Sequence, residues 1–171
     1  MWRADTGAYQ DLRHGLLIGM YNLLLLGHIL GSTALVGGTL LLQVLAVRAT
    51  WPSAPRDELL GLARQAGWVG PRVFLPASAL ILVTGAGLSS QLHYALDEPF
   101  VLIGLGVLLA ASATGPAFLA PESRRIGRVI AERGAHCAEV ERRVRRIFLV
   151  SRVELTLLLL ALTAMVLRPT L

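Results

Sequence analysis

Four long segments of this chain carry almost no charged side chains, and this pattern restricts the fold more than any other feature. Residues 15–47, 73–96 and 99–121 contain no Asp, Glu, Lys or Arg. Because an α-helix rises about 1.5 Å per residue, about 20 apolar residues cross a hydrocarbon core of about 30 Å. Each of these three segments is long enough to form a membrane-spanning helix.

The fourth segment, residues 147–167, contains Arg152 and Glu154, so its insertion depends on a balance of free energies. Its 13 Leu, Ile, Val and Phe residues contribute about −0.3 to −0.6 kcal/mol each on the insertion scale, or about −4 to −8 kcal/mol together. Two charges at the bilayer centre cost about 5–7 kcal/mol, and less when they lie off-centre as these do. The balance favours insertion.

The fold class predicted from these segments is all-α. We expect a single integral membrane domain over residues 1–171, a polytopic four-helix transmembrane bundle with short amphipathic cytoplasmic helices. A soluble bundle is disfavoured because only 16% of the residues are charged, against about 25% in soluble domains. The predicted spans are residues 20–47, 72–93, 99–120 and 147–167.

The arginines predict the orientation of the bundle. The chain has no lysine, and 12 of its 16 arginines lie in two connections, those between the first and second and between the third and fourth spans. The connection between the second and third spans has no arginine and carries Asp97 and Glu98. The positive-inside rule places the arginine-rich connections in the cytoplasm and both termini outside it. We therefore expect a multi-pass protein of the bacterial inner membrane, with the lipid bilayer rather than nucleic acid explaining the net charge of +5.

Both arginine-rich connections are expected to contain helices. Residues 53–66 predict a short surface helix with an apolar face. After Pro121, Ile126 and Val129 lie on one side of a second helix, and a third begins after Gly134. Favourable i,i+4 ion pairs predict that this third helix runs into the fourth span without a stop. Those pairs are Glu139 with Arg143 and Glu141 with Arg145.

A polar stripe runs along the first span. At about 100° per residue, its members lie within roughly 60° of one another on the helix. They are Tyr21, His28, Ser32, Thr39 and Gln43. Because polar groups that face lipid are costly, we expect this stripe to face the other helices. Gly27 and Gly31 lie beside it as a GxxxG pair, which allows a neighbouring helix to approach closely.

Two polar layers follow from counting residues inward from the arginines. His28 lies 20 residues from Arg48 and His93 lies 21 residues from Arg72, which predicts similar heights near the outer face. Tilt or a slide of the overlong first segment would move His28 toward mid-bilayer. A second layer near the inner face is expected to hold Glu154 with Thr39, Ser78 and Thr114.

Histidine in a helical bundle is a common ligand of haem b and of copper. We predict His28 and, less directly, His93 as the cofactor-binding or metal-binding residues. In the alternative interpretation no cofactor is bound, His28 makes an interhelical hydrogen bond, and His93 is a solvated loop residue. His14 is a further candidate ligand, and Met20 and Met165 are candidate sulfur donors for copper.

The two charged residues of the fourth span point in different directions. Arg152 and Glu154 lie about 160° apart on the helix, so they cannot pair with each other. We expect Glu154 to face the bundle and Arg152 to reach the inner interface. An intramembrane carboxylate suggests a proton relay. The structural alternatives are a hydrogen bond to Thr39 or Gln43, or an ion pair with Arg72.

Three stretches carry a resemblance to a known family: GHILGSTALVGG (residues 27–38), FLPASALILVTGAGL (residues 74–88) and MVLRP (residues 165–169). They resemble a bacterial family of four-span integral membrane proteins without an assigned activity. That family is grouped with copper-resistance protein D and with the haem-binding, membrane-bound protoporphyrinogen oxidase. Similarity to the oxidase group implies that His28 is a haem ligand. That group also relies on an intramembrane lysine, which this chain lacks, so the same porphyrinogen chemistry is disfavoured.

Three functions remain open from the sequence. The first is a redox or metal-handling protein that binds haem b or copper at His28. The second is a cofactor-free accessory or assembly protein, whose partner would be a second copy or another membrane protein. The third is a proton-coupled carrier that uses Glu154. No motif of a hydrolase, a phosphate-binding loop or a nucleotide-binding fold is present, so the sequence does not indicate whether the protein is an enzyme.

Overall fold

The computed structural model describes residues 6–51, 68–95, 97–134 and 137–167, with five separate residues between positions 52 and 67, and side chains from residue 13 onward. The helices are α1 (Thr6–Ala49), η1 (Gly70–Phe74), α3 (Leu75–Leu92), α4 (Pro99–Thr114), η2 (Gly115–Leu119), α5 (Ala120–Arg133) and α6 (Ala138–Leu167), where η marks a π-helical turn. They form four helical stretches that are long and apolar enough to cross a membrane. The predicted all-α, four-helix fold class is confirmed.

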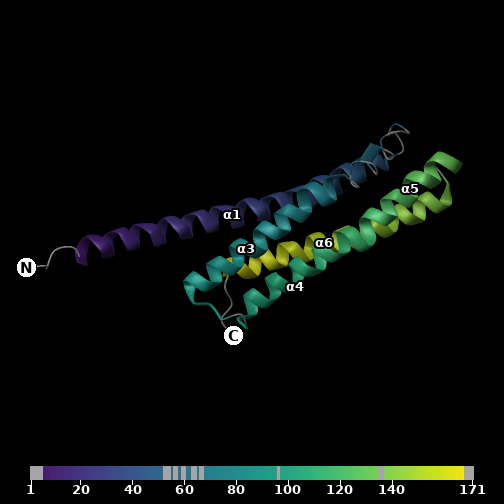
Figure 1. Ribbon diagram of the computed structural model, residues 1–171. Helices are drawn as coiled ribbons and strands as arrows, with labels where there is room; N and C mark the ends of the chain where they lie inside the picture. Colours follow the sequence, from purple (N-terminus) through teal and green to yellow (C-terminus); the bar gives the residue numbers. More distant parts are fainter. Residues whose placement is uncertain are drawn as a thin grey trace, which may run out of the picture.

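The four long helices form two antiparallel pairs. Helix α1 packs along α3, helix α4 packs along α6, and contacts between α1 and α6 join the pairs. Helices α3 and α4 have only a small contact with each other. Figure 1 shows that α1 begins and α6 ends on the side of the bundle where α3 is joined to α4. The two arginine-rich connections therefore share the opposite end.

Glycines bring α1 and α3 into close contact. A Cβ at Gly27 would lie 3.0 Å from the Thr84 methyl carbon. A Cβ at Gly31 would lie 2.8 Å from Ile81 Cγ1 and 3.2 Å from the carbonyl oxygen of Ala77. The predicted close approach of a neighbour at this GxxxG pair is confirmed, and the neighbour is α3.

This register leaves the N-terminal part of α1 beyond the bundle. Because Gly27 faces Thr84 and the helices are antiparallel, Leu92 at the end of α3 is level with about residue 20 of α1. All described side chains from Arg13 to Met20 are exposed. Helix α1 has 44 residues, or about 66 Å, and Figure 1 shows it projecting past the other helices.

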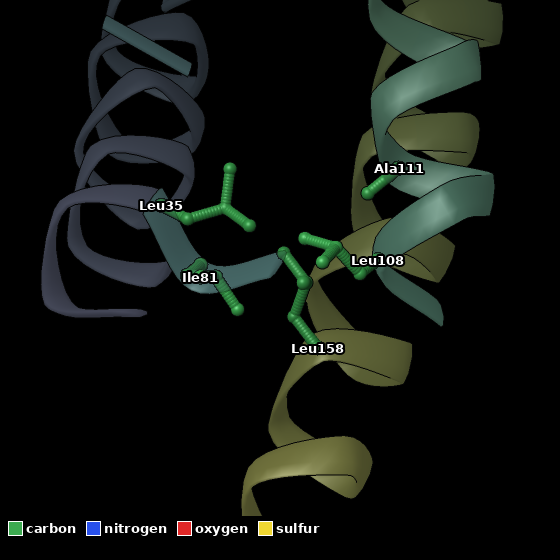
Figure 2. Packing of buried hydrophobic residues seen from close by; sticks show 5 residues of the cluster. All are labelled: Leu35, Ile81, Leu108, Ala111 and Leu158. Atoms are coloured by element: carbon green, nitrogen blue, oxygen red, sulfur yellow. The ribbon is translucent and has the colours of Figure 1, made fainter. Parts of the chain in front are cut away.

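All four helices contribute to one apolar core. Figure 2 shows Leu35 of α1, Ile81 of α3, Leu108 and Ala111 of α4 and Leu158 of α6 around a common centre. Each of them is less than 9% exposed. Many other large apolar side chains are exposed, among them Leu23 at 70% and Val83 at 67%. An apolar exterior around a small core is what a bundle in lipid requires.

The second arginine-rich connection forms a helical stem. Ile126 of α5 packs against Val140 and Val144 of α6. Arg143 donates hydrogen bonds to Glu122 (2.7 Å) and to Glu139 (3.1 and 2.9 Å), so it links the two helices. These bonds lower the pKa of the Glu139 carboxyl, which lies outside the predicted span. The ion pair of Glu141 with Arg145 is also present, and α6 continues from the stem into the fourth span as predicted.

The helix of the third span continues into the second arginine-rich connection. We expected the span to end at residue 120 and the cytoplasmic segment, itself helical, to start at Pro121. The structure joins the two, because the helix runs from Pro99 to Arg133 through the π-helical turn at Gly115–Leu119. Pro116 lacks an N–H and disturbs the i→i−4 pattern, and the wider turn accommodates it without breaking the helix. Most of the helix expected over residues 53–66, including Ser53 and Ala66, lies outside the described residues.

Candidate functional site

The polar stripe of α1 faces the bundle. Thr39 is buried, and the other four members, Tyr21, His28, Ser32 and Gln43, are partly buried. Asn22 and Thr33, the polar residues of the span that lie off the stripe, are exposed. The predicted inward orientation is confirmed, and the stripe brings one titratable ring, His28, against α3.

His28 contacts α3 at Thr84 and Gly85. Its Nδ1 lies 3.2 Å from the hydroxyl oxygen of Thr84. A Cβ at Gly85 would lie 3.2 Å from the Cε1 carbon of the ring, so glycine at this position makes room for the imidazole. His28 was predicted from the sequence, but its partner Thr84 was not. A hydroxyl next to a glycine in an apolar span, here Thr84–Gly85, was the available signal.

The hydrogen bonds around Thr84 assign the histidine tautomer. The Thr84 hydroxyl donates to the carbonyl oxygen of Leu80 at 2.6 Å and lies 3.3 Å from that of Ile81. Since a hydroxyl has one hydrogen, which is used on the backbone, the Thr84 oxygen accepts a hydrogen bond from Nδ1–H of His28. The neutral ring then has its free lone pair on Nε2. A histidine held in this way is prepared to bind a metal through Nε2.

A cavity of about 280 Å³ adjoins His28 between α3 and α4, and we call it the outer cavity. Most of its wall is apolar, and its polar side chains besides His28 are Ser89 and Tyr94. Tyr94 packs edge-on against Phe100, with ring centroids 5.2 Å apart. A smaller space of about 40 Å³ continues inward from His28 past Ser32.

Met165 of α6 is the second side chain beside the outer cavity with an atom suited to bind a soft metal, its thioether sulfur. Both His28 and Met165 line the outer cavity and the smaller space. Gly104 of α4 leaves room for the methionine, because a Cβ there would overlap the Met165 methyl group. From the sequence, Met165 was predicted only as a candidate sulfur donor. The fold places it at the same cavity as His28.

His93 does not join His28. It caps the C-terminus of α3 in the left-handed conformation (φ 57°, ψ 28°) and is exposed. The equal heights expected for the two histidines are not found, because His28 is level with Thr84, nine residues before His93, or about 13 Å along the helix. The two arginines used as reference points do not lie at the same level. Gly38 of α1 faces Phe74, two residues from Arg72, so Arg48, ten residues further along α1, lies past the level of Arg72.

The other outer candidates also lie away from the outer cavity. His14 is exposed on the projecting part of α1, and Met20 is 49% exposed. Within the described part of the chain there is no group of three or more His, Cys, Asp or Glu side chains that would hold a metal ion. A metal at this site would therefore need a donor of another kind, such as the thioether of Met165.

Glu154 of α6 faces the bundle, and Arg152 faces outward. Glu154 is partly buried and Arg152 is exposed, as predicted. Glu154 lines a cavity of about 240 Å³ between α4 and α6, which we call the inner cavity, and Thr114 lines it too. The expected inner layer thus brings these two residues together.

The structural alternatives for Glu154, a hydrogen bond to Thr39 or Gln43 or an ion pair with Arg72, are not formed. Thr39 donates to the carbonyl oxygen of Leu35 at 2.8 Å, and Thr114 donates to that of Ala110 at 2.8 Å. The Arg72 guanidinium lies over the Trp68 ring, 5.0 Å from its centroid. Among the described residues, none forms a hydrogen bond or an ion pair with Glu154. The inner layer is a set of polar groups at similar depth, without a network that links them.

Comparisons of the chain with protein-family models, with curated proteins and with solved structures found no match. The function is therefore argued from the two cavities and the side chains that line them.

Proposed function

We propose that this membrane protein binds a copper ion in the outer cavity, through Nε2 of His28 and the sulfur of Met165. The observation that carries the proposal is the hydrogen bond of His28 Nδ1 to Thr84, whose hydroxyl is already committed to the backbone. It orients the ring and keeps Nε2 free for a metal. Copper bound here would take part in one-electron transfer or in copper handling across the membrane.

The donor set favours monovalent copper among the common metals. Thioether sulfur selects Cu(I), and imidazole also suits copper. Zinc in structural sites takes four ligands, and calcium and magnesium require oxygen ligands. The outer cavity is lined mainly by apolar side chains, with Ser89 and Tyr94 as its other polar groups. An apolar surrounding also excludes the water that would stabilise Cu(II).

Haem b is the other cofactor expected from the sequence, and the cavity fits it less well. Pockets for drug-sized ligands have volumes of about 300–1,000 Å³. At about 280 Å³ the outer cavity lies just below this range. A porphyrin with its propionates would require α3 and α4 to move apart, whereas a single ion fits beside His28 without such a movement.

The metal content and the visible spectrum test the proposal. The protein is purified in mild detergent from copper-replete and haem-replete cells, in a Cys137→Ser background because a free thiol also binds Cu(I). We expect one copper per chain and no Soret band. A Soret band together with bound iron would show that the cofactor is haem b and not copper. A preparation free of both that also fails to take up Cu(I) would contradict the proposal and favour a cofactor-free accessory protein.

We also propose that the protein lies in the inner membrane with the α5–α6 stem in the cytoplasm and both termini outside. The support is the clustering of arginines at one end of the bundle, opposite the α3–α4 connection.

The single cysteine tests this orientation. Cys137 lies at the turn between α5 and α6 and is partly exposed. We expect a membrane-impermeant maleimide to leave it unlabelled in intact spheroplasts and to label it after lysis. As a matched control, Asp97→Cys in the Cys137→Ser background places a thiol at an exposed position of the opposite connection, which should be labelled in intact spheroplasts. The reverse pattern would show the opposite orientation.

A further inference from the structure

The inner cavity combines apolar walls with one carboxylate. Its lining comes from α4 and α6 alone and consists of seven apolar residues with Thr114 and Glu154. Glu154 is the only titratable residue among them. Thr114 uses its hydroxyl hydrogen on the Ala110 carbonyl, so this residue offers lone pairs and no further hydrogen. The polar groups of the cavity are therefore suited to a positively charged or hydrogen-donating ligand.

No arginine in the described part of the chain forms an ion pair with Glu154. Arg146, two turns before Glu154 on α6, lies over the Phe118 ring at 5.1 Å from its centroid. Arg72 lies over Trp68 at 5.0 Å. Arg152 faces away from the bundle and is exposed. Among the described residues, the Glu154 carboxyl group thus has no ion-pair partner.

The cavity is accessible from the apolar exterior of the bundle. Two of its lining side chains, Leu149 and Val153, are 65% and 52% exposed. On a transmembrane bundle this exterior is in contact with lipid chains. A ligand that dissolves in the bilayer reaches the cavity sideways, whereas a strongly hydrated ion such as sodium would first have to lose its hydration shell, at a large cost.

We propose that the inner cavity binds a lipophilic organic cation, with its apolar groups against α4 and α6 and its positive charge beside the Glu154 carboxylate. The cavity of about 240 Å³ accepts part of a small amphipathic cation. Glu154 lies within the apolar stretch of α6, one turn from the buried core residue Leu158, so a cation bound there is deeper than the lipid headgroups. The proposal does not depend on the copper site. Both cavities touch α4 and α6, but no residue lines both of them.

Equilibrium binding of tetraphenylphosphonium tests this proposal. The protein is purified in the uncharged detergent dodecyl maltoside, and the bound probe is measured by dialysis. We expect saturable binding, and no saturable binding of the anion tetraphenylborate, which has a similar shape. Glu154→Gln should raise the dissociation constant roughly 10–100-fold, which corresponds to the loss of one charge-assisted contact. Arg152→Gln on the outward face of the same helix is the matched control and should bind as the wild type does.

A second variant tests the cavity with Glu154 intact. Ala110→Phe places a ring in the inner cavity from an exposed position of α4, and it should weaken binding by a similar factor. The helical circular dichroism and the thermal unfolding of each variant report whether the bundle is intact. Absence of saturable binding in the wild type, or wild-type affinity in either Glu154→Gln or Ala110→Phe, would overturn the proposal. If Glu154→Gln cannot be purified, Ala110→Phe decides alone.

Discussion

Replacement of Gly31 by leucine is expected to separate α1 from α3 and to destabilise the bundle strongly. The new Cβ would lie 2.8 Å from Ile81 Cγ1 and 3.2 Å from the backbone oxygen of Ala77. The isoleucine can change its rotamer, but the backbone oxygen moves only if α3 moves. Overpacking usually lowers the free energy of unfolding by about 1–3 kcal/mol, and we expect a decrease of about 3 kcal/mol or more here. Thermal unfolding in detergent, followed by circular dichroism, measures it.

Gly37 is the matched control for this substitution. It lies on the same helix, is exposed, and has no other atom within 4 Å of the position of a Cβ. Gly37→Leu should therefore leave the unfolding temperature unchanged or raise it slightly, because leucine is a better helix former than glycine. If Gly31→Leu and Gly37→Leu unfold at the same temperature, the close packing of α1 on α3 is wrong.

Removal of the His28 imidazole is expected to abolish copper binding in the outer cavity. In the Cys137→Ser background, His28→Ala loses the only nitrogen donor that we assign to the metal. Thr84→Val keeps the shape of the side chain but removes the hydroxyl that accepts from Nδ1. Loss of such an orienting partner typically costs about 10–100-fold in metal affinity. Competition with a Cu(I) chelator measures both variants on one scale.

His93→Ala is the control for this series, because His93 is exposed at the end of α3 and does not line the outer cavity. Its copper affinity should equal that of the parent. An unchanged copper affinity in His28→Ala, or a reduced copper affinity in His93→Ala, would show that His28 is not the ligand that we propose.

Helix-scale features could be predicted from the sequence because they depend on local spacing. The stripe from Tyr21 to Gln43 has a helical period, so its inward face followed from the cost of polar groups in lipid. The continuity of α6 followed from the pairs Glu139–Arg143 and Glu141–Arg145, which the structure contains. The angle between Arg152 and Glu154 indicated that they face different ways, and the longer arginine side chain, which can reach the interface, favoured the inward orientation of Glu154 that the structure has.

Relations between helices could not be obtained in the same way. The height of His28 depends on the α1–α3 register, and counting from the arginines failed because Arg48 lies past the level of Arg72 when Gly38 faces Phe74. The partner Thr84 is placed by the packing of α3 on Gly27 and Gly31 of α1, and Met165 by the packing of α6 on Gly104 of α4. Only the folded arrangement brings Met165 of the last helix to the cavity beside a histidine of the first.

X-ray absorption at the copper edge tests the proposed site most directly, because it reports the atoms bound to the metal. With Cu(I) loaded into the Cys137→Ser protein, we predict an imidazole nitrogen and a thioether sulfur in the first coordination shell. Met165→Leu conserves the volume of the side chain, so it should remove the sulfur signal while the helical content stays the same. A first shell without sulfur, or a sulfur signal that persists in Met165→Leu, would contradict the site formed by His28 and Met165.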